Sequence, residues 1–136
     1  MKDIRPAIHD FLLGDPTVNA LVGGFRIHSV RLPQGQVAPS LVFNRVSETA
    51  DYTMKEDSGL SSIRIQFDSW AQTADQANEL ASATRDRLSG YRGPMVGNSE
   101  AIEVRGIFVV SELDSYDDVT KLYRISRDYN LWYLTK

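Results

Sequence analysis

Apolar residues near the amino terminus recur with the spacing of an α-helix. The positions that share one helix face are Ile4, Ala7, Ile8, Phe11 and Leu12. This first helix is expected to end near Gly14. Asp15 and Pro16 have the side chains typical of the start of a second, shorter helix, which Gly23 and Gly24 would end. Both helices are predicted to be packing elements.

After Phe25 the apolar period changes to two, which predicts strands over 25–30 and 41–46. The clearest alternation is at Ile63, Ile65 and Phe67, with Trp70 on the polar side of that strand. Between these segments, residues 47–62 are polar and are predicted to form a long hairpin or a mobile arm. An exposed Trp70 would need a partner.

The second half of the chain predicts a long helix followed by strands. Thr73 and Gln76 have capping-box spacing, and an alanine-rich apolar stripe continues to Leu88. A strand over 102–110 is apolar on both sides at its end and is expected to be central. Residues 112–121 are interpreted as an acidic loop, and 122–134 as a final strand with a tyrosine-rich row that Arg127 interrupts. The order of elements predicts an α+β fold, with a mostly antiparallel β-sheet, one main helix packed on one face and short N-terminal helices.

Length and charge narrow the class of protein. The chain has 136 residues, of which 42% are hydrophobic and 24% charged, which fits one globular domain over 1–136. Its formal net charge of −3 disfavours a general nucleic-acid binder. The amino terminus lacks a secretory pattern and the longest apolar runs have four residues, so we expect a soluble, intracellularly made protein with no membrane partner.

The sequence offers no candidate reactive centre. It has no cysteine, and His9 and His28 lack the spacing of a metal site. The acidic residues after 112 lack the order of a calcium loop, and no phosphate-binding or nucleophile motif is present. The carboxylates elsewhere are scattered, so an enzyme is left without support. We predict no catalytic residue, no metal site and no cofactor.

Large apolar side chains fall on faces that a lone sheet would expose to water. These are Trp70, Ile107 or Val109, and Trp132, which lies opposite the tyrosine-rich row. They indicate self-association, because Trp and Tyr are favoured in buried interfaces. The alternative is a second layer supplied by the first helices or the long loops.

Several segments, in this order and spacing, resemble one known family. They are LVGGFRI at 21–27, PSLVFNRV at 39–46, SGL at 58–60 before RIQFDSW at 64–70, the helix at 74–88, and LYRIS at 122–126 with the aromatic residues that follow. Together they resemble the tail-completion and tail-terminator family of long-tailed bacteriophages over nearly the whole chain. Each segment is a hydrophobic pattern rather than a chemical signature. Arg127 departs from the pattern of the last strand, where an uncharged residue is expected.

The resemblance implies a structural virion protein rather than an enzyme. Family members form a ring, typically a hexamer, on the head-proximal end of the tail tube, where the ring ends tube growth and joins the tail to the neck. The implied partners are further copies of the chain, the tail tube protein and a neck or head-completion protein. DNA would pass through the lumen without specific binding. Assembly would take place in the host cytoplasm, and the protein would end in the virion tail.

Two sets of residues are predicted to make these contacts. The subunit or tube interface is expected to contain Tyr52, Met54, Lys55, Asp57, Trp70 and Trp132. The neck or lumen contact is expected to contain Asp114, Asp117 and Asp118. Two other classes stay open: a head-closure or neck connector protein, and a small intracellular ligand-binding module or enzyme.

Overall fold

The computed structural model describes residues 3–29, 39–52, 57–97 and 100–135. The helices are α1 (Arg5–Leu13), α2 (Pro16–Leu21) and α3 (Ala74–Leu88). The strands are β1 (Ile27–Ser29), β2 (Ser40–Tyr52), β3 (Asp57–Ala71), β4 (Gly93–Gly97), β5 (Glu100–Asp117) and β6 (Leu122–Leu134). In the described part of the chain, no helix has the length and apolar character needed to cross a membrane.

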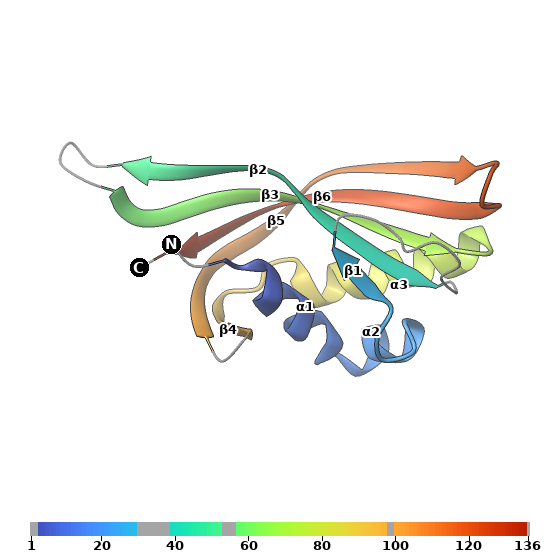
Figure 1. Ribbon diagram of the computed structural model, residues 1–136, viewed down its shortest axis with the longest axis horizontal. Helices are drawn as coiled ribbons and strands as arrows, with labels where there is room; N and C mark the ends of the chain where they lie inside the picture. Colours follow the sequence, from blue (N-terminus) through green and yellow to red (C-terminus); the bar gives the residue numbers. More distant parts are fainter. Residues whose placement is uncertain (1–2, 30–38, 53–56, 98–99, 136) are drawn as a thin grey trace.

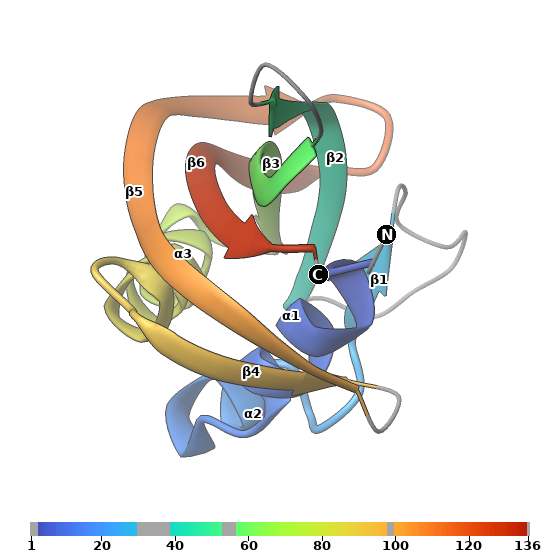
Figure 2. The same cartoon turned by 90° about the vertical axis from the view of Figure 1, so that its left-hand side faces the viewer.

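The six strands form one sheet in the order β1-β2-β3-β6-β5-β4. β1 runs parallel to β2, and every other neighbouring pair is antiparallel. Figure 2 shows that this sheet is strongly curled, with β5 wrapping around β6 and β3. The predicted α+β fold with a mostly antiparallel sheet and one main helix is therefore only coarsely right, because the sheet is mixed and curled, and α1 packs against it as well as α3.

The core lies between the concave side of the sheet and the helices. It gathers alternate residues of the central strands with the apolar faces of the helices: Ile8, Leu12, Val18, Phe43, Ile63, Ile65, Phe67, Leu80, Leu88, Tyr129, Leu131 and Tyr133. Phe67 and Tyr129 meet edge to face, with ring centroids 5.3 Å apart. The alternation in β3 therefore places its apolar row inside, as its sequence pattern predicts.

Local capping explains where α2 and α3 begin. The Asp15 side chain accepts a hydrogen bond from the Val18 N–H at the start of α2, and the Thr73 hydroxyl accepts one from the Gln76 N–H at the start of α3.

α1 packs closely on β4, where a Cβ on Gly97 would lie 2.3 Å from the Ala7 backbone nitrogen. Only glycine permits this approach.

The acidic segment 112–121 is a strand for most of its length, so the prediction of a loop is wrong. β5 continues to Asp117, pairs with β6 in register to Asp117–Leu122, and a short turn then joins the strands. This half of β5 is a strand because it pairs with β6, and its charged sequence gives little strand signal of its own. β5 is also not central, because β4 covers it only over 100–104.

Candidate assembly surfaces

Two long hairpins point in opposite directions along the sheet (Figure 1). One is the β2–β3 hairpin, which contains the polar segment 47–62. The other is the β5–β6 hairpin, which contains the acidic residues. They give the two ends of the molecule different surfaces.

The backbone of the β2–β3 hairpin is paired as far as Tyr52 and Asp57. Two bulges, after Arg45 and after Ala50, interrupt the register. Of the predicted interface residues, Tyr52 and Asp57 therefore lie at the outer ends of the two strands, whereas Met54 and Lys55 lie outside the described residues.

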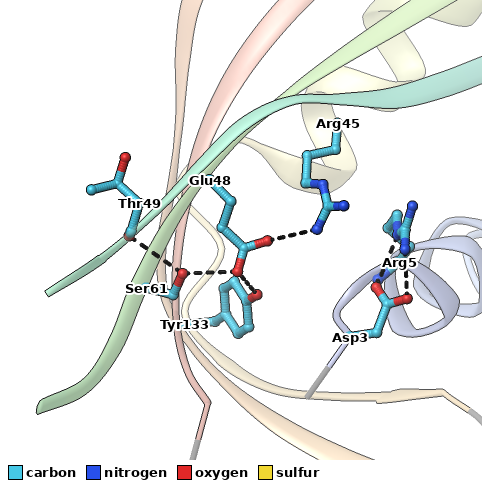
Figure 3. Close-up of polar contacts among 7 residues, drawn as sticks. All are labelled: Asp3, Arg5, Arg45, Glu48, Thr49, Ser61 and Tyr133. Carbon is cyan, nitrogen blue, oxygen red and sulfur yellow. Dashed lines mark hydrogen bonds and ion pairs between the residues drawn. The ribbon is translucent and has the colours of Figure 1, made fainter. Parts of the chain in front are cut away.

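A partly buried polar cluster holds the base of this hairpin (Figure 3). The Tyr133 hydroxyl donates to Glu48 Oε2 at 2.6 Å, and the Ser61 hydroxyl donates to the same oxygen at 3.0 Å. Arg45 Nη1 lies 3.2 Å from the other Glu48 oxygen. Burial, reinforced by the Glu48 carboxylate, raises the pKa of the Tyr133 hydroxyl well above its usual value. The cluster thus ties β2, β3 and β6 together where the hairpin leaves the core.

The β5–β6 hairpin is both acidic and apolar. Leu113 is 63% exposed and Val119 is 90% exposed. Tyr116 packs on Tyr123 across the hairpin, with ring centroids 4.8 Å apart, and both remain exposed. Exposed apolar groups at this density are typical of a surface that is covered in an assembly.

The three acidic residues predicted to meet the neck or the lumen are spread along this hairpin. Asp114 is an exposed strand residue of β5, paired in register with Ile125. Asp117 ends the strand and accepts a hydrogen bond from the Val119 N–H, which lowers the pKa of the Asp117 carboxyl. Asp118 lies in the turn itself. Among the described residues no group of three His, Cys, Asp or Glu side chains is arranged to hold a metal ion.

Trp70 and Trp132 lie on the same face of the sheet, opposite the core, as their positions in the pattern predict. In the register of β3 they are eight residues apart, since Trp132 pairs with Ser62, so they stand about 27 Å from each other. Trp70 is partly covered by Arg124, whose guanidinium carbon lies 5.3 Å from the ring centroid, while Trp132 is 38% exposed. They belong to two separate surfaces.

The two predicted contact sets meet at one place. A shallow hollow at the base of the β5–β6 hairpin is lined by Trp70, Ser115, Tyr116, Asp117, Asp118 and Arg124. Trp70, expected at a subunit interface, therefore lies beside Asp117 and Asp118, expected at the neck. Arg124 also donates to the Ser115 hydroxyl at 3.1 Å, which holds its guanidinium in position over the indole.

The exposed apolar residues of β5 are not those expected from its sequence. Ile107 is buried and Val109 is partly buried, whereas Phe108 and Val110 are exposed. A bulge between Val109 and Ser111 explains Val110, because it adds one residue to β5 and shifts the alternation. Gly106 leaves space for the Phe108 ring, whose nearest atoms lie 2.9 Å from where a Cβ would be.

Arg127 lies in the tyrosine-rich row and is buried beneath α3. Its Nη1 donates to the Ala81 carbonyl at 2.6 Å, and its Nε lies 3.2 Å from a Glu112 carboxylate oxygen. The residue that interrupts the apolar row therefore joins β6 to α3 and β5. It is a structural contact and does not face a partner surface.

Comparison with known proteins agrees with this geometry. The profile of one family, described as Tail completion protein gp17, matches residues 6–134. Among solved structures, a chain from a "Virion of native gene transfer agent (GTA) particle" is similar in fold, with a TM-score of 0.64 and 17% sequence identity, covering 93% of this chain and 91% of that chain. No curated protein matches the sequence.

Proposed function

Because this chain belongs to the Tail completion protein gp17 family, we propose that it forms a closed ring, of six subunits, on the head-proximal end of a phage tail tube. There the ring ends tube growth and joins the tail to the neck. In this role the chain is a structural protein of the virion tail, without catalysis.

The observation that carries the proposal is the opposed pair of hairpins. A ring built by rotation repeats one heterologous contact until it closes, and its upper and lower surfaces then differ. Each subunit here has one polar hairpin and one acidic, apolar hairpin at opposite ends of the same sheet (Figure 1). Such a subunit suits a ring that binds a tube on one side and a neck on the other.

We assign the β2–β3 hairpin to the neighbouring subunit or the tube. Tyr52 and Asp57 form the outermost pair of its strands, and we assign Met54 and Lys55 to the same contact. The turn of the β5–β6 hairpin, with Asp117 and Asp118, contacts the neck or the lumen. DNA passes through the ring without specific binding, and the net charge of −3 is compatible with this passage.

A tube-growth assay tests the proposal. Tail tube protein is elongated from short seeds, with and without the purified chain, and tube lengths are measured by negative-stain microscopy. We expect the chain to cap one end and to stop elongation at a ratio of one ring per tube. Unchanged tube lengths, or binding to emptied heads in place of tubes, would contradict the role of tail terminator.

A further inference from the structure

Two strands of the sheet have long edges that no described strand covers. β1 pairs with β2 only over 41–43, and β4 pairs with β5 only over 93–97 with 100–104. Among the described residues, 44–52 of β2 and 108–117 of β5 therefore have a neighbouring strand on one side only. Edges of this length attract further strands, and β5 has neither proline nor lysine over 108–117 to prevent it.

The backbone groups on both edges are directed outwards at defined residues. The Asp117 carbonyl accepts from Lys121 across the turn, so its groups face β6, and strand alternation turns those of Asp114 outwards. On β2, the Leu41 N–H donates to the Arg26 backbone carbonyl, which lies on the side of β2 away from β3. Alternation from Leu41 turns the groups of Arg45 outwards as well.

The directions of the two edges fit a ring. Strands β2, β3, β6 and β5 alternate in direction, so β2 and β5 run opposite ways. A rotation about a ring axis keeps the direction of each strand along that axis. The β2 edge of one copy therefore meets the β5 edge of the next copy antiparallel, and the four-strand alternation continues around the ring.

Charge selects a register for this pairing. If Asp114 faces Arg45 of the next copy, an acidic and a basic side chain stand directly opposite each other. Both side chains lie on the concave side of the sheet, because Asp114 pairs with Ile125 and Arg45 pairs with Ile65 of the core. Both are exposed in the single chain.

The same register gives an acceptable strand tilt. Within one subunit, Asp114 pairs with Ile125 of β6, which pairs with Ser69 of β3, which pairs with Leu41 of β2. Asp114 and Leu41 therefore lie at the same position along the strand direction. Facing Arg45 therefore displaces the next copy by four residues, about 13 Å, over four strands that span about 19 Å. The resulting tilt is about 35°, which falls in the range of closed barrels, about 35–45°.

We propose that the seam between neighbouring subunits is an antiparallel pairing of the β5 edge with the β2 edge of a second copy of this chain, in the register that places Asp114 opposite Arg45. The seam joins the sheets of neighbouring subunits into one continuous sheet. This inference rests on the proposed function, since it supplies the contact from which the ring is built.

A designed disulfide tests the seam. The chain has no native cysteine, so Asp114→Cys and Arg45→Cys introduce one pair. Facing residues whose backbones bond to each other have Cα atoms about 5.5 Å apart, within disulfide range. On mild oxidation of the assembled full chain, we expect a ladder of covalent oligomers that ends at the ring number. The control pair Asp114→Cys and Ser47→Cys should give no ladder, because Ser47 pairs with Arg64 and points to the other face.

A proline variant gives the second reading. Asp114→Pro removes an outward N–H, which an edge strand tolerates, so the monomer should fold normally by circular dichroism while ring assembly is lost. The matched control Asp114→Asn keeps the N–H and should still assemble. If the unmodified chain forms rings but the cysteine pair gives no ladder, the proposed seam is wrong and the proposed ring is unaffected. The same conclusion follows if the proline variant still forms rings. Absence of rings from the unmodified chain, even with tail tubes present, would overturn both.

Discussion

Two tyrosines of β6 separate the effect of a hydrogen bond from that of burial. Tyr133 donates to Glu48, whereas the buried Tyr129 hydroxyl has no hydrogen-bond partner among the described residues. We expect Tyr133→Phe to lower the free energy of unfolding by about 1–2 kcal/mol, because Glu48 loses a donor in a largely buried position. Tyr129→Phe should leave it unchanged or raise it slightly. Urea unfolding at neutral pH measures both, and an equal loss in the two variants would refute the assignment.

The same tyrosines predict alkaline unfolding. Burial raises the pKa of Tyr129 to about 12, above the value of about 10 in an unfolded chain. A raised folded pKa means that the stabilisation is complete below pH 10 and is lost as the pH rises from 10 towards 12. For Tyr129 this loss amounts to about 3 kcal/mol. Unfolding free energies measured from pH 9 to 12 should fall steeply in the wild type and less steeply in Tyr129→Phe; identical slopes would contradict the prediction.

Gly97 permits the close contact of α1 with β4. A methyl group there would lie 2.3–2.5 Å from three backbone atoms of Pro6 and Ala7, none of which belongs to a flexible side chain. We expect Gly97→Ala to destabilise the fold by about 1–3 kcal/mol through overpacking. The control is Gly14→Ala, where the nearest atoms are 3.4 Å away. Thermal unfolding compares the two, and a neutral Gly97→Ala would show that α1 can move away from β4.

At the scale of elements, the β2–β3 hairpin should separate folding from assembly. The outermost pair of its strands, Tyr52 with Asp57, lies beyond the Glu48 cluster along the hairpin. Replacing 51–58 by Asn-Gly leaves a four-residue loop, with Gly59 and Leu60, between the paired residues Ala50 and Ser61, and should leave a folded monomer because hairpins accept loops of this length. Binding to tail tubes should be lost, which co-sedimentation measures. Normal tube binding by a folded variant would remove the hairpin from the proposed interface.

The elements with strong local signals were predictable from the sequence. α3 begins after Thr73 as its capping pattern indicates, and the alternation of β3 places Ile63 and Ile65 in the core. The course of β5 was not, because its bulges shift the alternation and its charged half becomes a strand only by pairing with β6. The parallel pairing of β1 with β2 likewise depends on contacts distant in the sequence.

The surfaces were predictable in part, for the same reason. The pattern placed Trp70 and Trp132 on the face opposite the core, but only the register shows that they stand far apart. The hollow that joins Trp70 to Asp117 depends on β5 being a strand, which the acidic sequence concealed. In the sequence Arg127 interrupts an apolar row. The structure explains this residue, because its guanidinium donates a hydrogen bond to the Ala81 carbonyl of α3.

At the scale of the whole molecule, fold and family point to assembly. A curled sheet with helices on its concave side leaves its opposite face, two edges and two hairpins available for contacts (Figure 2). The chain from the gene transfer agent particle matches this fold over nine-tenths of both chains. A ring of such subunits would present the hairpins on opposite surfaces.

The most direct test is to locate the chain in assembled particles by cryo-electron microscopy. The account predicts a closed ring of this fold at the junction of tail tube and neck, with DNA passing through it in filled particles. Density for the chain at the distal tail tip or inside the head, or a single unringed copy at the junction, would contradict it.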